Sequence, residues 1–297
     1  MPTVDIIIPA YNAARFLPAA LESVISQTYT DWRIILVDDG STDNTAAVAH
    51  EFQRRLQDRM LVITQPNGGQ NAARNTAVRN STAEFLATLD ADDIWLPSRL
   101  ADSLKAFEGR PHVGLSYGLI TWIDESGAPL ETFQGNPRDR EGRIAPAIYM
   151  RTVELPCPTI TFRRKCIEEV GLFDETMRGT EDRDMWFRIA LRHEVAFIPK
   201  VIAYYRVSAN SMSSDLNRMF TGQRQFIDKH YGAPGCGLIA RRIALSRVYK
   251  QRAETLFGRR SRRAALLSAL RAFAIWPFST GNLRTAGSIA LRSLFGR

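Results

Sequence analysis

Cysteine is scarce in this chain, and long apolar runs are missing. Only three cysteines occur among 297 residues, Cys157, Cys166 and Cys236. An odd number without zinc-like spacing favours free thiols in a reducing compartment. No stretch of about 18 apolar residues occurs, which argues against a membrane-spanning helix. The first residues, MPTVDIIIPA, also lack the basic region and long apolar run of a signal peptide. These absences predict a cytoplasmic protein.

Glycine-rich phosphate-binding loops are missing as well. Neither the pattern G-x-G-x-x-G nor G-x-x-x-x-G-K occurs in the chain. Such loops let backbone N–H groups approach a phosphate at a helix N-terminus. Their absence argues against a Rossmann dinucleotide turn and against a P-loop.

Acidic residues are nearly absent from the last part of the chain. From Arg241 to Arg297 there are thirteen Lys or Arg residues and one acid, Glu254, a charge of +12. Since the whole chain carries +8, the remainder carries −4. Three explanations suit a basic helical tail: packing on the catalytic domain with arginines reaching water, contact with an anionic membrane surface, or nucleic-acid binding. No recognised nucleic-acid motif occurs, so no nucleic-acid partner is expected.

Short apolar runs alternate with helical patterns in the first part of the chain. The runs are rich in Ile, Val and Leu and are bounded by turn residues, as buried parallel strands are. The predicted strands are Val4–Ile8, Ile34–Val37, Leu61–Thr64 and Phe85–Leu89. The predicted helices are Leu17–Ile25, Thr45–Leu56 and Gln70–Arg79. This order predicts an α/β protein with a single doubly wound, mainly parallel sheet and flanking helices.

The pattern changes after residue 110. Further predicted strands are Gly114–Ile123, Thr159–Phe162, Val195–Ile198 and Val201–Tyr205, and Glu181–Arg192 is a predicted helix. From about Ser214 the chain has helical patterns alone. We therefore expect a main domain over residues 1–212 and a basic helical extension over residues 213–297. The change of pattern divides the main domain into residues 1–110 and residues 111–212.

Two acidic clusters follow predicted strands. Asp38 and Asp39 end the second strand, before a Gly-Ser turn, and ligands bind at such strand ends in doubly wound sheets. A carboxylate here repels phosphate but can accept a hydrogen bond from a base N–H or a ribose hydroxyl. A capped turn with solvated acids is the structural alternative.

The second cluster is Asp90-Ala91-Asp92-Asp93, directly after the fourth predicted strand. Three neighbouring carboxylates repel one another unless a cation neutralises them. Mg²⁺ and Mn²⁺ bind through one or two carboxylates together with substrate phosphates. A solvated acidic loop is the alternative. Trp95, just beyond, is the best aromatic candidate for stacking on a sugar or a nucleotide, although core packing is the more common role.

A third acidic motif lies at the start of the predicted helix Glu181–Arg192. Early acids favour the positive end of a helix dipole, which is a sufficient structural explanation. Asp182 is also placed to act as a general base.

Together these segments resemble family 2 of the glycosyltransferases, which are inverting enzymes with the GT-A fold. The resemblance covers roughly residues 3 to 210 and depends on three segments in the family's order and spacing. The segments are IIIPAYNAARFLPAALESVISQTYTDWRIILVDDGSTDNT, NGGQNAARNTAVRNSTAEFLATLDADDIWLPSRL and GLFDETMRGTEDRDMWFRIA. The departures are minor: Ala91 stands where Ser is more frequent, and Thr76 where Gly is often found.

The resemblance implies that residues 1–212 are the catalytic domain, with residues 1–110 as the donor-binding half and residues 111–212 as the acceptor-binding and catalytic half. It also implies roles for the matching residues of this chain. The implied nucleotide-sugar contacts are Pro9, Tyr11, Asp38, Asp39, Arg74, Asp90, Ala91 and Asp92. Asp39 would recognise the base, Asp92 would bind Mn²⁺ or Mg²⁺ directly with Asp90 beside it, and Asp182 with its neighbour Glu181 would supply the catalytic base.

The implied reaction is hexosyl transfer from a nucleotide-diphosphate sugar, UDP- or dTDP-linked in particular, to a hydroxyl of a saccharide or lipid-linked acceptor. Such enzymes build cell-envelope polysaccharide or lipopolysaccharide in bacteria, which favours peripheral contact of the basic helices with the inner face of the membrane. A non-catalytic nucleotide-sugar-binding scaffold and a metal-dependent nucleotidyltransferase are the alternatives. The second usually has a basic, glycine-rich loop where this chain reads PAYNAAR from Pro9 to Arg15.

Overall fold

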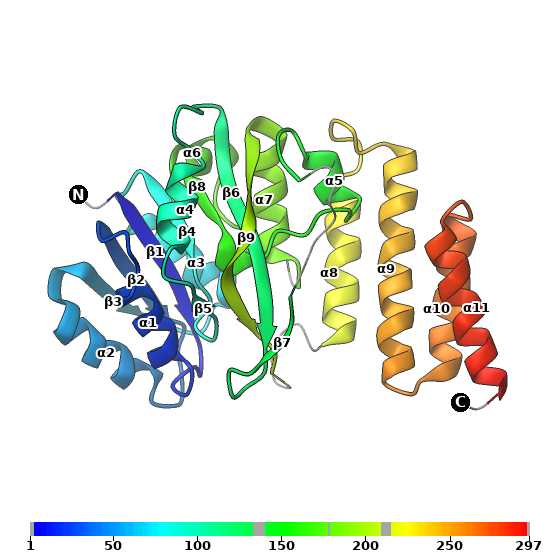
Figure 1. The fold of residues 1–297 in the computed structure, drawn as a ribbon, viewed down its shortest axis with the longest axis horizontal. Coiled ribbons are helices and arrows are strands. Elements are labelled where there is room, and N and C mark those ends of the chain that lie inside the picture. Colours follow the sequence, from blue (N-terminus) through cyan, green and yellow to red (C-terminus); the bar gives the residue numbers. More distant parts are fainter. Residues whose placement is uncertain (1–2, 133–139, 178, 209–214, 296–297) are drawn as a thin grey trace. The chain divides into compact units, whose positions relative to one another are not determined.

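A computed structural model describes residues 3–132, 140–177, 179–208 and 215–295 of the chain. The chain divides into two compact units (Figure 1). The first, which we call the sheet unit, comprises Met1–Ile144, Glu154–Glu175 and Glu181–Ala209. The second, the helical unit, comprises Ala145–Val153, Thr176–Thr180 and Asn210–Arg297. The division of the chain into donor and acceptor halves stays a prediction.

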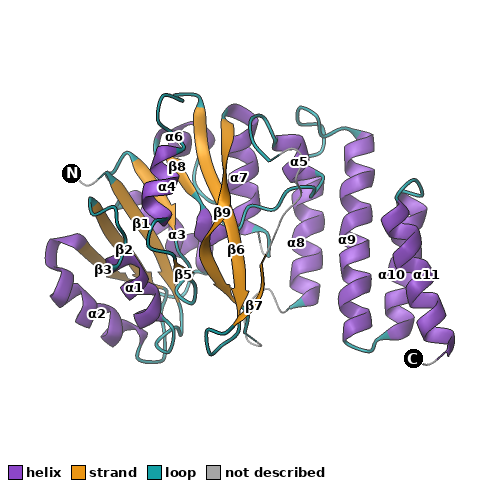
Figure 2. Cartoon of the chain, in the orientation of Figure 1, coloured by secondary structure: helices purple, strands orange, loops and turns teal. Residues whose placement is uncertain are grey.

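The sheet unit contains one nine-stranded sheet (Figure 2). The strands are β1 Val4–Ala10, β2 Trp32–Asp38, β3 Met60–Thr64, β4 Phe85–Thr88, β5 Ile94–Trp95, β6 Val113–Ile123, β7 Pro129–Thr132, β8 Thr161–Arg163 and β9 Glu194–Arg206. Their order is β3-β2-β1-β4-β8-β6-β9-β5, and β7 pairs with β6. The first four are parallel, whereas β8 runs antiparallel to both β4 and β6. The α/β architecture predicted from the sequence is confirmed, with a mixed sheet beyond β4.

Helices flank this sheet on both faces. They are α1 Leu17–Ile25, α2 Thr45–Leu56, α3 Gln70–Arg79, α4 Arg99–Lys105, α6 Lys165–Val170 and α7 Glu181–Arg192, with short 3₁₀ turns at Gln57–Arg59 and Cys157–Thr159. Alternate residues of β1, Val4, Ile6 and Ile8, pack in the main core with Leu17 and Leu21 of α1. Figure 1 shows α1 and α2 on this face and α3 on the other, as right-handed crossovers require.

Strand β9 corrects one sequence expectation. Val195–Ile198 and Val201–Tyr205 were predicted as two strands, but both belong to β9. The register against β6 shifts between the pairs Gly118–Ile198 and Leu119–Val201, so Pro199 and Lys200 are the extra residues of a bulge. Proline lacks a backbone N–H, so in a sequence it indicates the end of a strand. At a bulge no ladder hydrogen bond is needed from that residue, and the strand continues through it.

A buried carboxylate ties the amino ends of three strands together. Asp5 of β1 accepts two hydrogen bonds from the Arg33 guanidinium of β2 (2.9 and 3.0 Å). It also accepts from Ser81 Oγ (2.7 Å) and from the backbone N–H groups of Thr82 (2.8 Å) and Ala83 (3.0 Å), just before β4. Burial raises the pKa of Asp5, but these bonds outweigh burial and hold the pKa below its ordinary value.

The helical unit consists of α5 Ala145–Tyr149, α8 Leu216–Lys229, α9 Leu238–Gly258, α10 Arg262–Ile275 and α11 Thr280–Phe295. Helices α9, α10 and α11 lie side by side (Figure 1). Mostly small side chains are buried in their shared core: Ala253, Ala265, Ala269 and Ile289. None of the described helices is both long enough and apolar enough to span a bilayer. The three cysteines are free and buried, as predicted.

Candidate functional site

The two acidic clusters lie at the carboxyl ends of β2 and β4, the two parallel strands on either side of β1. Ala10, the last residue of β1, pairs with Asp38, the last residue of β2. The backbone N–H of Asp39 donates to Ala10 O (2.8 Å). Strand β4, which pairs with the other side of β1, ends at Thr88, two residues before Asp90. The sheet therefore brings both clusters to one edge, as the sequence predicts for a doubly wound fold.

Asp39 is the anchor of the loop between β3 and α3. Its buried carboxylate accepts hydrogen bonds from Gln65 Nε2 (2.7 Å), Gly68 N (2.9 Å) and Gly69 N (2.8 Å). Gly40 makes room for this loop: its φ is +74°, and a Cβ there would lie 2.8 Å from Asn67 N. A carboxylate has about four lone-pair sites, so Asp39 retains one acceptor position beyond these three donors.

Helix α3 connects this loop to the second cluster. Gln70 Nε2 and Arg74 Nη2 both donate to Asp90 Oδ1, at 3.0 and 2.8 Å. Arg74 is 2% exposed and its Nη2 also contacts Cys157 Sγ (3.2 Å). Its Nε has no hydrogen-bond partner within the described part of the chain. One buried guanidinium is therefore fixed beside Asp90 with a donor unused.

Asp182 lies on the first turn of α7, and its carboxyl group interacts electrostatically with the Arg74 guanidinium. Burial raises the pKa of the Asp182 carboxyl, and the Arg74 guanidinium opposes this shift. The backbone N–H of Arg183 donates to Asp182 Oδ1 (2.7 Å). The neighbouring Glu181 is buried and raises the pKa of Asp182 further. A carboxyl with a raised pKa is suited to general acid–base chemistry.

The cluster from Asp90 to Asp93 holds its carboxylates at unequal depth. Burial, with the charge of Asp90, raises the pKa of Asp92 to about 6. Asp93 is fully buried, and burial together with its two acidic neighbours raises its pKa strongly. Arg206, at the end of β9, fixes the loop by donating from its backbone N–H to Asp93 Oδ1 (2.8 Å) and from Nε to Asp92 O (2.8 Å). The Asp92 carboxylate thus carries a charge that its surroundings leave poorly neutralised.

This donor set suits a divalent cation that is shared with a substrate. No group of three or more His, Cys, Asp or Glu side chains within the described ranges could hold a metal ion by itself. Mg²⁺ and Mn²⁺ are commonly held by one or two carboxylates plus phosphate oxygens and waters. Asp92 fits that pattern because a cation would relieve the repulsion from Asp90 that raises its pKa.

The remaining residues predicted to contact the nucleotide sugar differ in how exposed they are. Pro9 is buried within β1, where it pairs with Val37. Tyr11, just beyond the strand, is 52% exposed, and Ala91 is buried. Trp95 is also buried in the main core and donates from Nε1 to Pro158 O (2.7 Å). Its ring is therefore a core residue and not a sugar-stacking platform.

Several residues that organise the site were missed from the sequence. Gln65 and Gln70 hold Asp39 and Asp90, and Arg206 holds the loop that carries Asp92. Asn75 exchanges two hydrogen bonds with the backbone of Phe173 (2.9 Å each), which fixes the segment before α7 to α3. Their partners are 20 to 114 residues away, so local patterns carried no signal for these contacts.

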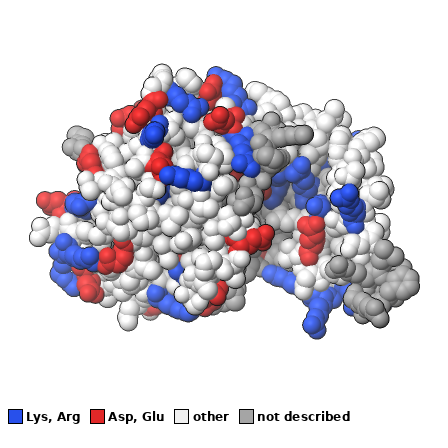
Figure 3. Space-filling view, in the orientation of Figure 1, with Lys and Arg blue, Asp and Glu red and all other residues white. Residues whose placement is uncertain are grey.

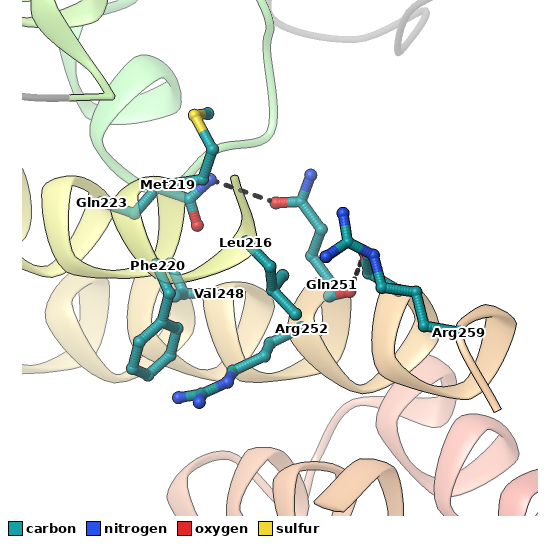
Figure 4. Close-up of a pocket in the computed structure, with 9 residues that line it drawn as sticks. Leu216, Met219, Phe220, Gln223, Val248, Gln251, Arg252 and Arg259 are labelled. Carbon is teal, nitrogen blue, oxygen red and sulfur yellow. Dashed lines mark hydrogen bonds between the residues drawn. The ribbon is translucent and has the colours of Figure 1, made fainter. Parts of the chain in front are cut away.

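A separate pocket lies in the helical unit, between α8 and α9 (Figure 4). Its volume is about 150 Å³, and its lining residues are Leu216, Met219, Phe220, Gln223, Val248, Gln251, Arg252, Thr255 and Arg259. The Arg252 guanidinium lies 4.0 Å from the centre of the Phe220 ring. No acid lines the pocket, so it is not the predicted metal site.

These features define an α/β fold with acidic residues at the carboxyl ends of two parallel strands. A model of Glycosyl transferase family 2 matches residues 5–171, and the chain belongs to this family. It is therefore a glycosyltransferase, an enzyme that transfers a sugar from a nucleotide donor. The resemblance seen in the sequence is confirmed.

Relatives and solved structures agree with this assignment. A glycosyltransferase of Nostoc sp. is 32% identical over 71% of this chain and 67% of its own length. The putative teichuronic acid biosynthesis glycosyltransferase TuaG of Bacillus subtilis is 26% identical over 72% of this chain and 82% of its own. S. aureus TarS with UDP-GlcNAc has a TM-score of 0.65 at 16% identity, covering 99% of this chain and 92% of TarS. The mannosyltransferase PcManGT of Pyrobaculum calidifontis, with GDP-Man and Mn²⁺, has a TM-score of 0.67 at 20% identity, covering 98% and 80%.

Proposed function

We propose that this enzyme is an inverting, metal-dependent glycosyltransferase that uses a UDP- or dTDP-sugar and a hydroxyl of a saccharide or lipid-linked acceptor. The observation that carries the proposal is the link that α3 makes between Asp39, Asp90 and Asp182. Gly69, just before α3, donates to Asp39. Arg74 of α3 donates to Asp90, and its charge opposes the rise in the pKa of Asp182. That TarS binds UDP-GlcNAc and that TuaG is named for teichuronic acid biosynthesis supports a uridine donor and an envelope polymer.

Asp39, with Asp38 beside it, is assigned to the base of the donor. Its remaining acceptor position suits the N–H of uracil or thymine, which present the same edge. Pro9 and Tyr11 lie on the neighbouring strand end, where the exposed Tyr11 ring can contact the nucleoside. Arg74 is assigned to the phosphate side because its guanidinium is buried beside Asp90 with one N–H unused.

Asp92 is assigned to the metal, with Asp90 beside it and Ala91 between them. A bound Mn²⁺ or Mg²⁺ would neutralise the charge that grows on the departing nucleoside diphosphate. The complex of PcManGT with Mn²⁺ supports the use of a divalent ion.

Asp182 is assigned as the general base, next to Glu181. Its carboxylate takes the proton of the acceptor hydroxyl while that oxygen forms a bond to the anomeric carbon. The bond from the anomeric carbon to the phosphate oxygen breaks on the opposite side, so the configuration inverts. No covalent sugar–enzyme intermediate is needed.

Calorimetric titration tests this assignment. UDP, dTDP and GDP, each with Mn²⁺ and with EDTA, are titrated into the wild type, Asp92→Asn and Asp182→Asn. We expect metal-dependent binding of UDP or dTDP, at least a tenfold loss in Asp92→Asn, and near-normal binding in Asp182→Asn. Asp58→Asn, which changes an exposed acid in the 3₁₀ turn after α2, is the control and should behave as wild type.

Turnover completes the test. Asp182→Asn should lose at least a thousandfold in transfer of the sugar while it still binds the nucleotide. Near-normal turnover of that variant would remove Asp182 from the role of base. Equal binding with Mn²⁺ and EDTA would argue against the metal, and absence of nucleotide binding would favour a non-catalytic scaffold.

A further inference from the structure

Helix α10 buries three alanines against its neighbours and exposes two of its three leucines, whereas Leu266 packs against the core of the helical unit. Ala265, Ala269 and Ala272 face the neighbouring helices and are at most 1% exposed. On the opposite side, Leu267 is 61% and Leu270 is 50% exposed. A helix that is satisfied by its own domain buries leucine and leaves small residues outside. Leu267 and Leu270 therefore form an apolar surface on α10 that the described helices of the helical unit leave uncovered.

Arginines share that outer face. Arg263, Leu267, Leu270 and Arg271 recur at spacings of three or four residues, which places them on one side of the helix. Beyond the helix, Phe278 is 81% exposed and packs edge-on against Trp276, with ring centres 5.4 Å apart. We call this set of exposed residues the α10 face: Leu267 and Leu270 flanked by Arg263 and Arg271 on the helix, with Phe278 in the segment that follows.

From the start of α10 onward every charged residue in the sequence is basic, although Figure 3 shows an acidic group as well as basic ones over the helical unit. No Asp or Glu occurs after Glu254 in the sequence. Helix α10 is preceded and begun by the run Arg259-Arg260-Ser261-Arg262-Arg263, and Ser261 makes no side-chain capping bond. Cations at a helix N-terminus oppose the helix dipole, so the run is locally unfavourable. An anionic partner would offset that cost.

From this arrangement we propose that the α10 face docks on an anionic lipid bilayer. Leu267, Leu270 and Phe278 enter the boundary between headgroups and acyl chains, while Arg263 and Arg271 remain among the phosphates. This is how amphipathic basic helices lie on membranes. A second copy of this chain is a poor occupant because two α10 faces would bring only positive charge together.

Vesicle flotation of the full chain tests the proposal. The probes are vesicles of phosphatidylcholine alone and vesicles with about 30% phosphatidylglycerol, the second resembling the charge of a cytoplasmic leaflet. We expect the wild type to bind only the anionic vesicles, with at least a tenfold loss in about 0.5 M salt, where exposed charges are screened.

Two paired variants locate the surface. The double variant Leu267→Ser with Leu270→Ser should lose at least tenfold in binding, and so should Arg263→Gln with Arg271→Gln. The matched controls are Leu130→Ser, an equally exposed leucine (59%) of the sheet unit, and Arg54→Gln, an exposed arginine of α2. Both controls should bind as wild type. All substituted side chains are outside the core, and circular dichroism confirms folding.

Several results would overturn the proposal. They are absence of vesicle binding, equal binding to neutral vesicles, equal loss in the controls, and a dimer in sedimentation that the leucine variants dissociate. The test is independent of the proposed function because nucleotide binding is measured without vesicles. A chain that binds UDP but no vesicle refutes only the membrane proposal, and the reverse refutes only the donor site.

Discussion

Substitution of Asp5 by Asn should destabilise the sheet unit and leave the donor site intact. Four of the five donors to this carboxylate converge on Oδ2, from Arg33, Ser81, Thr82 and Ala83. The asparagine amide has one acceptor oxygen, so at least one of the donors that now bind the carboxylate would face the amide NH₂ group and lose its acceptor. Each unsatisfied buried group costs about 1–3 kcal/mol, and breaking a buried ion pair costs about 3–5 kcal/mol. We therefore expect the free energy of unfolding to fall by about 3–5 kcal/mol at pH 7.

The pH dependence follows from the lowered pKa of Asp5. Because the folded state holds the pKa below its unfolded value, the stabilisation is complete above about pH 4 and is lost as the pH falls through the folded pKa. Urea unfolding of the wild type and Asp5→Asn between pH 7 and pH 3 measures this. The difference should be largest at pH 7 and should shrink toward pH 3. A difference below about 1 kcal/mol at pH 7, or one that grows in acid, would refute the reasoning. The nucleotide affinity of the folded variant should match that of the wild type, since Asp5 lies at the amino ends of the strands and the candidate site lies at their carboxyl ends.

Two further predictions concern the site. Arg74→Gln should move the acidic limb of the pH–rate profile of kcat/KM to higher pH by about one to three pH units, because the charges of Arg74 and then Arg183 oppose the rise in the pKa of Asp182 that burial causes. The matched Arg74→Lys keeps the charge and should leave the limb near its wild-type position; equal shifts in both variants would point to a structural effect. Gly40→Ala should lower the free energy of unfolding by about 2 kcal/mol or more, and by more than Gly69→Ala does. Both positions have a positive φ, but only at Gly40 would the added Cβ meet a backbone atom, Asn67 N. Equal losses of stability in chemical denaturation would show that the loop can move aside.

Local patterns in the sequence were sufficient for most of the sheet unit. The helices predicted at Thr45–Leu56, Gln70–Arg79 and Glu181–Arg192 have the observed bounds, because each carries an uninterrupted helical period between turn residues. The strand ends that carry Asp39 and Asp90 were placed correctly for the same reason. The break predicted at Pro199 was wrong because a bulge absorbs that residue within β9.

Contacts between distant segments could not be predicted in the same way. The antiparallel insertion of β8 between β4 and β6 depends on pairing across more than 40 residues, for which no local period exists. Arg99 is completely buried against Ile160 O (2.5 Å) and the ring of Trp95 (4.1 Å), although arginine usually marks a surface. This contact also explains why Trp95, a candidate for sugar stacking, is a core residue.

Under the proposed roles, helix α3 couples donor recognition to acid–base chemistry. Its ten residues follow the loop that Asp39 holds, carry Arg74 beside Asp90 and bind the backbone of Phe173 through Asn75. A change that shifts this helix to suit a different nucleotide would also move Arg74, whose charge lowers the pKa of the proposed base Asp182. Selection for new donors is therefore expected to act on the exposed rim around Tyr11, where side chains can vary without altering the geometry of the reaction.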